Sequence, residues 1–195
     1  SDWTITTTEG GSGNASEALT DGDGGLLLVT NDDADDDNDF FQLVKEGFKY
    51  ESSKQLAFNM RFKTNDATQT DIVAGLQLTD TSPLDVTDGI FFLKSDGATT
   101  VTFIVEKDST QSTLDLPNAL ADDTFMTVGF VYDPKDQKFH VFQNNVLAGT
   151  VVSTNAPDDE ELALSFGIQN GAAAAKTLTV DYIGAHKERT AVTEL

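Results

Sequence analysis

The sequence contains no cysteine, only four prolines and a single tryptophan among its 195 residues. Without cysteine, neither a disulfide nor a thiolate metal site can form. No apolar run approaches the roughly 20 residues that a membrane-spanning helix needs, and no basic-then-apolar leader is present. We therefore expect a soluble protein with no membrane partner.

Basic residues are also scarce. The chain has 12 Lys and Arg against 33 Asp and Glu, which gives a net charge of −21. No basic residue precedes Lys45, whereas this first stretch already carries eleven acids. Binding to phosphates depends on Lys and Arg that release counterions, so the composition argues against a nucleic-acid partner.

What the sequence does contain is a repeated period of two. Leu56, Phe58, Met60 and Phe62 alternate with more polar residues, which is typical of a strand with one face in a core. Thirteen phenylalanines concentrate the apolar content in large side chains. The same alternation recurs in residues 71–79, 89–94, 99–106, 125–133 and 178–186.

Turn residues separate these runs. Asp96-Gly97 and Asn144-Asn145 are typical of hairpin turns, and all four prolines fall between the runs. No segment shows a helical period, and "GAAAAK" (171–176) is too short to form a helix. About ten to twelve strands of this kind predict an all-β fold, a two-sheet antiparallel jelly-roll sandwich.

The N-terminal stretch differs from the rest. Residues 1–24 are rich in Gly, Ser and Thr, and only "DWTITTT" alternates, so we expect an arm or edge strand followed by a flexible stretch. Trp3 and Ile5 share a face, which either docks on a neighbouring subunit or pairs within the same sandwich. We predict one sandwich domain over residues 25–189 and a C-terminal tail over 190–195.

The arrangement "DGIFFLKSDGATTVTFIVEKDST", "VGFVYDPKDQKFHVFQNNVLAGT" and "LTVDYIGAHKER" resembles the concanavalin A-like (laminin-G-like) jelly-roll domains. Their late hairpin reads aromatic-x-hydrophobic-x-x-Asn-Gly, and Phe139, Val141, Asn144 and Asn145 stand in that pattern. Asn145 replaces the common glycine and still permits the turn.

The segments "LQLTDTSPLDVTDGIFFLKSDG" and "PDDEELALSFGIQNGAAAAKTLTVDYIGAHKER" also look like the jelly-roll proteins of tailed bacteriophage virions. This resemblance covers roughly residues 25 to 189. It implies a capsid decoration or cement protein on the outside of the capsid, soluble in the host cytoplasm before assembly. The implied partners are the major capsid protein and further copies of the chain, as a dimer or trimer.

Six aspartates between Asp32 and Asp39 suggest a calcium loop. An EF-hand aligned from Asp35 places Glu46 at the twelfth position, but Phe40 stands at the sixth, where a glycine is required. A looser calcium site within the run competes with a solvated acidic loop, and we favour the loop.

Catalytic patterns are absent from the sequence. Glucanases of this fold place carboxylates as Glu-x-Asp-x-(x-)Glu on one strand, and no strand here has that spacing. His140 alternates outward beside Phe139, as a surface residue would. The loops at Asp88-Gly89 and Asn144-Asn145 could bind sugar, but hairpins require the same residues.

The resemblance to virion proteins, together with the absence of a catalytic pattern, implies a non-enzymatic virion protein without catalytic residues, cofactor or metal. Strong negative charge keeps particles soluble and mutually repelling. Lys176, Lys187 and Arg189 are late basic residues that could mark the side that docks on the capsid. The alternative is a carbohydrate-binding or host-adhesion module for surface glycans, on the head or the tail.

Overall fold

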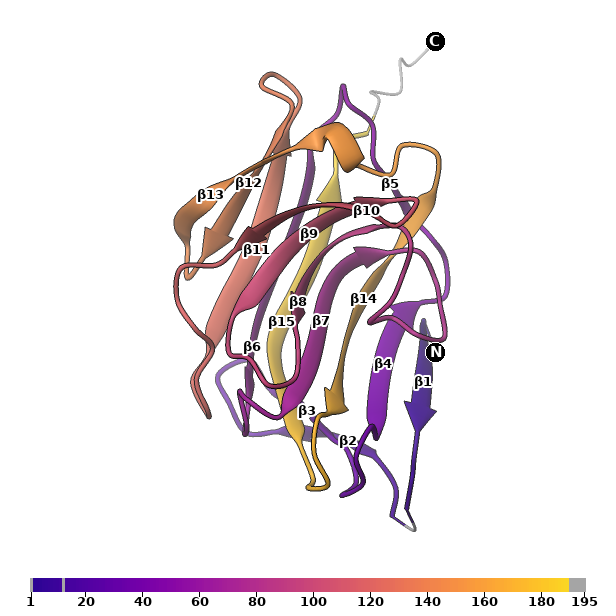
Figure 1. The fold of residues 1–195 in the computed structure, drawn as a ribbon, viewed down its shortest axis with the longest axis vertical. Helices are drawn as coiled ribbons and strands as arrows, with labels where there is room; N and C mark the ends of the chain where they lie inside the picture. The colour runs from indigo at the N-terminus through magenta and orange to yellow at the C-terminus, as the bar shows by residue number, and fades with distance from the viewer. Residues whose placement is uncertain (1, 12, 190–195) are drawn as a thin grey trace.

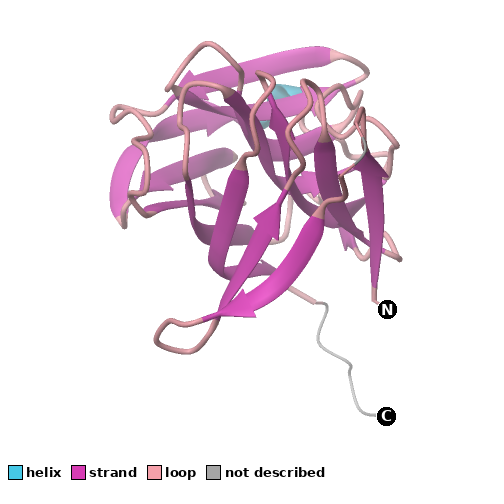
Figure 2. Cartoon of the chain, turned by 90° about the horizontal axis from the view of Figure 1, so that it is seen from below, coloured by secondary structure: helices cyan, strands magenta, loops and turns pink. Residues whose placement is uncertain are grey.

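The computed structural model describes residues 2–11 and 13–189, which form two antiparallel β-sheets packed face to face (Figures 1 and 2). One sheet has eight strands, in the order β1 (Trp3–Thr8), β4 (Asn38–Leu43), β14 (Glu161–Asn170), β7 (Thr70–Gln77), β8 (Gly89–Lys94), β9 (Val101–Lys107) and β10 (Thr110–Asp115), with β5 (Phe48–Lys49) paired to β14. The other has seven, in the order β13 (Val146–Val152), β12 (Lys138–Gln143), β11 (Met126–Asp133), β6 (Leu56–Thr64), β15 (Thr177–Lys187), β3 (Leu26–Thr30) and β2 (Ser16–Thr20).

The predicted fold class is confirmed. The helical structure of the described residues is one 3-10 turn, η1 (Ser153–Asn155), drawn in cyan in Figure 2. No helix in this part of the chain is long and apolar enough to cross a membrane.

The core between the sheets is built from the alternating residues. Leu56, Phe58, Met60 and Phe62 are each at most 3% exposed, so the inward face of β6 is the predicted one. Rings from both sheets meet at the centre of the core, which joins the two layers through aromatic contacts. The rings in contact there are Phe58, Phe92, Phe103, Phe130 and Phe139.

The predicted hairpin turn between β12 and β13 is also confirmed. Asn144 and Asn145 both have positive φ, 50° and 64°, the left-handed conformation that asparagine tolerates better than most residues. Gly97, with φ of 74°, serves the longer turn between β8 and β9.

The N-terminal stretch is more ordered than the sequence suggests. Trp3–Thr8 pairs with Asn38–Leu43 as an edge strand of its own sandwich. Residues 16–20, predicted to be flexible, form a second edge strand against β3, because Leu26–Thr30 offers them a free edge. The domain boundary at residue 24 stays a prediction, and the tail at 190–195 lies outside the described residues.

Candidate functional site

The outer face of the eight-stranded sheet is filled by the chain's own aromatic side chains. Phe91 lies opposite Gly75 and Phe40 opposite Gly167 on neighbouring strands, and a Cβ atom on either glycine would come within 2.4 Å of its phenylalanine. Both rings are at most 3% exposed. They form a second apolar cluster, outside the main core, with Val73, Val86 and Ile104.

The loop of residues 78–88 covers this cluster. Gln77 Nε2 donates to the carbonyl of Pro83 at 2.8 Å, and Gln42 Nε2 donates to the carbonyl of Leu78 at 3.3 Å. Both glutamines are buried, although outward-facing glutamines on strands suggest solvent exposure. Their partners lie in an irregular loop, so the alternation of the strands did not reveal them.

Carboxylates on this sheet are not arranged in pairs. No β-strand of residues 2–11 and 13–189 carries two of them. Glu106 on β9 is 5% exposed, and this burial raises its pKa. The hydrogen bond from Gln111 Nε2 lowers the pKa, whereas the charges of Asp88 and Asp85 raise it further. Asp88 is equally buried, so a bulky substrate has little access to either group.

The outer face of the seven-stranded sheet is hollowed. The hollow has a volume of about 540 Å³ and crosses four neighbouring strands. A row in register forms its floor: Phe142 on β12, Gly129 on β11, Asn59 on β6 and Gly184 on β15. The two glycines leave room that side chains would fill, and Asn145 and His186 stand at its margin. An aromatic ring beside amide and imidazole groups suits a polar ligand with an apolar face.

His140 lies on the same outer face, as predicted. It alternates with Phe139 and Val141, which are fully buried, and its Nε2 lies 3.1 Å from Asp136 Oδ2. This contact places the ring against an exposed turn, so His140 is a surface residue in the structure.

The aspartate run differs from its predicted description as a solvated loop. Asp37 and Asp39 are fully buried, whereas Asp33, Asp35 and Asp36 are exposed. The prediction was wrong for these two, which accept hydrogen bonds inside the protein. Gly10 N and Ala34 N donate to the two oxygens of Asp37, at 2.5 and 2.9 Å, and Thr7 Oγ1 donates to Asp39 Oδ1. The run thus contributes buried acceptors that hold neighbouring loops, as well as surface charge.

Asp39 has a different environment from Asp37. Thr7 Oγ1 donates to its Oδ1, while its Oδ2 is buried without a hydrogen-bond partner among the described residues. Burial is the main cause that raises its pKa to about 6; the Thr7 bond lowers it, and the charges of Glu17 and Glu9 raise it further. An ionised carboxylate in such a place is costly.

Two groups of acidic residues have the spacing of metal ligands. One comprises Glu9, Asp32 and Asp37; the other comprises Asp133, Asp136 and His140. In the first, both oxygens of Asp37 and one of Glu9 already accept backbone N–H groups. These bonds tie the loop after β1 to the loop before β4, which explains the grouping. The absence of a metal stays a prediction.

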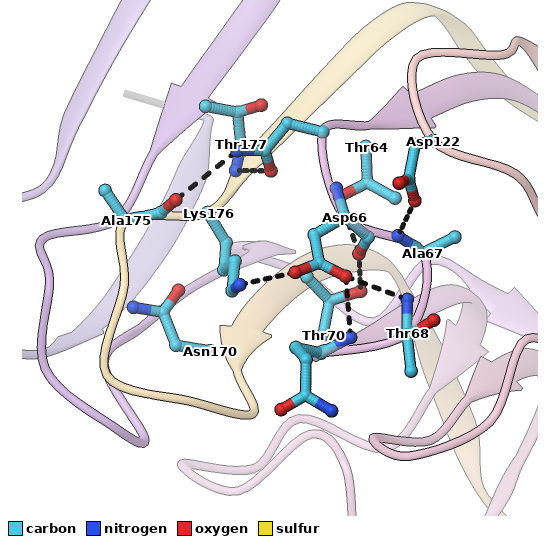
Figure 3. Close-up of polar contacts among 12 residues, drawn as sticks. Thr64, Asp66, Ala67, Thr68, Thr70, Asp122, Asn170, Ala175, Lys176 and Thr177 are labelled. Carbon is cyan, nitrogen blue, oxygen red and sulfur yellow. Dashed lines mark hydrogen bonds and ion pairs between the residues drawn. The ribbon is translucent and has the colours of Figure 1, made fainter.

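Two of the three late basic residues that could mark a docking side form ion pairs within the chain. Lys176 is 5% exposed and points into the protein, where its Nζ lies 2.6 Å from Asp66 Oδ2 (Figure 3). Asp66 also accepts from the backbone of Thr68 and Gln69, so the pair joins two loops at one end of the sandwich. Lys187 pairs with Glu51 at 3.2 Å.

No protein-family model and no curated protein sequence matches the chain. Solved structures are similar to it over nearly its whole length. The Emp46p carbohydrate recognition domain in its potassium-bound form matches with a TM-score of 0.63 at 11% identity, covering 95% of this chain and 88% of that one. An endo-1,3-beta-glucanase from Streptomyces sioyaensis matches with 0.62 at 13% identity, covering 94% and 88%.

A carbohydrate esterase from Shiga toxin-encoding bacteriophage phi24B matches with a TM-score of 0.59 at 11% identity, covering 96% of this chain and 90% of that one. At such low identity these likenesses establish the fold alone, a concanavalin A-like β-sandwich. Among these neighbours, the same fold occurs both in a carbohydrate recognition domain and in enzymes.

Proposed function

We propose that the chain is a non-enzymatic virion protein of a tailed phage, a decoration or cement protein that binds the outside of the capsid. The observation that carries the proposal is where the exposed apolar side chains lie. Of the seven large hydrophobic residues exposed in the described part of the chain, five lie on strands at sheet edges. These five are Ile5, Leu19, Val146, Leu147 and Val152.

Such an arrangement suits contacts with neighbours on two sides of one subunit. Edge strands with apolar side chains are the usual places where protein chains associate. Figure 1 places β1 and β13 on opposite sides of the molecule. A dimer or trimer that bridges neighbouring capsomers would use both sides.

The geometry of the outer faces supports a role without catalysis. The eight-stranded sheet is sealed by Phe40, Phe91 and the loop of residues 78–88. No described strand offers the two carboxylates that glycoside hydrolysis uses. Stabilisation of a shell needs only binding, because a protein that binds the assembled form and not the free subunits shifts the equilibrium toward assembly.

The proposal is tested with capsids prepared with and without this chain. At a concentration of about 100 times Kd, each occupied site stabilises the shell by roughly 2.7 kcal/mol, and repetition over many sites multiplies the effect. Capsids lacking the chain should release their genome at a lower temperature, and purified chain added back should restore the higher one. Equal release temperatures in all three samples would count against the role.

A carbohydrate-binding or host-adhesion module is the second candidate, and the hollow lined by Asn59, Phe142 and His186 favours it. A glycan array should then give hits that Gly184→Val abolishes. A Cβ atom at Gly184 meets only Asn59 Oδ1, at 3.4 Å, so valine fills the hollow at little cost to folding. Gly47→Val, in open space, is the control. An array without hits would exclude this candidate.

A further inference from the structure

One side of the sandwich is open between the two edge strands β1 and β2. Each has a neighbour on one side only among the described residues: β4 for β1 and β3 for β2. A groove of about 530 Å³ lies between the sheets there. Ile5 and Leu19, 42% and 87% exposed, stand at its rims, and Trp3, Phe41 and Phe166 lie deeper.

The two edge strands that bound the groove become acidic two residues further along. Thr7 follows Ile5 on β1, and Glu17 precedes Leu19 on β2. Asp39 lies opposite Thr7 on β4, two residues before Phe41, and is fully buried. The charges of Glu17 and Glu9 both raise the pKa of Asp39, so all three carboxylates add negative charge at this end of the two strands. An apolar section and an anionic section thus follow each other at the period of a β-strand.

We propose that this groove binds an extended segment of a partner protein that carries an apolar side chain and, two residues away, a Lys or Arg. The apolar side chain lies between Ile5 and Leu19, over Phe41. The cation faces Glu17, an exposed carboxylate on β2. An extended segment is the shape that fits between two edge strands.

Charge selects this occupant over a second copy of the chain. A second copy that presented this same edge would meet like charge, because no basic residue precedes Lys45 to offset the acids around the groove. A basic segment is attracted to the same place. The inference rests on the proposed capsid role only for the source of the segment, which would be a subunit of the shell.

The sole tryptophan, Trp3, lines the groove, so its fluorescence reports occupancy. The probe is the capped peptide Lys-Thr-Leu-Thr-Leu-Thr-Lys, which presents leucine and lysine two residues apart in either chain direction. The control peptide replaces both lysines with glutamate. The lysine peptide should change the emission and bind at least about tenfold more tightly than the control, and added salt should weaken it.

Leu19→Ser should weaken the lysine peptide about tenfold, because the exposed leucine contributes apolar contact to the ligand and little to the fold. Val146→Ser, 68% exposed on the opposite edge, is the matched control and should leave binding unchanged. The proposal is overturned if the lysine peptide does not bind at millimolar concentration or if the two peptides bind with equal affinity. It is also overturned if Leu19→Ser and Val146→Ser lose equal affinity for the lysine peptide.

Capsid binding separates this inference from the proposed role. If the wild-type chain binds capsids and Leu19→Ser binds them equally well, the groove is not the contact and the role stands. If the wild-type chain does not bind capsids, the role fails, and the peptide titration alone decides the groove.

Discussion

At pH 7, Asp39→Asn should make the protein more stable by about 1 to 3 kcal/mol, which raises Tm by roughly 3 to 9 °C for a chain of this size. The reason is the buried carboxylate, whose pKa of about 6 exceeds its ordinary value of 3.8. Asparagine keeps an oxygen for the hydroxyl of Thr7 and removes the buried charge. Its amide nitrogen replaces the oxygen that has no hydrogen-bond partner among the described residues.

The pH dependence gives the prediction its sign. Because the pKa of Asp39 is higher in the folded chain than in the unfolded one, the folded chain binds more protons between about pH 4 and pH 6. The contribution of Asp39 to stability therefore falls as pH rises through this window and is constant above it. In Asp39→Asn this contribution to the pH dependence of the free energy of unfolding disappears.

The measurement is urea unfolding of both proteins from pH 4 to pH 7. Asp33→Asn, an exposed member of the same run, is the control and should behave like the wild type. If Asp39→Asn is less stable than the wild type at pH 7, the ionised carboxylate of Asp39 stabilises the fold and the prediction is wrong.

The sandwich was predictable because its strands alternate strongly, as in Leu56–Thr64, where every second side chain is buried. Ser16–Thr20 escaped prediction because all five of its residues are exposed, so burial imposes no pattern on them. It is a strand because the edge of β3 is available.

The polar interior was harder to predict than the strands. Lys176 pairs with Asp66, which lies 110 positions earlier in the chain. Gln42 donates to the carbonyl of Leu78, which lies 36 positions later. Local sequence contains no sign of such pairings. The same holds for the groove, whose rims are brought together by the loop that carries the chain from one sheet to the other.

The largest loss of stability is expected for Phe130→Ala, about 3 to 5 kcal/mol. Phe130 is 1% exposed, and its ring contacts four other phenylalanine rings at centroid distances between 5.4 and 6.5 Å. Two of these rings belong to the opposite sheet, so alanine opens a cavity where the layers are joined. Surrounding strands cannot close it without breaking their register.

Phe125→Ala is the matched control. Its ring lies on the surface, with the guanidinium of Arg61 3.9 Å from its centroid, and its loss should cost only about 1 kcal/mol. Urea unfolding measures both variants. A loss below about 1.5 kcal/mol for Phe130→Ala would mean that the two sheets are held together elsewhere. Because the groove between β1 and β2 is bounded by both sheets, a variant that loosens their junction should also bind the lysine peptide more weakly.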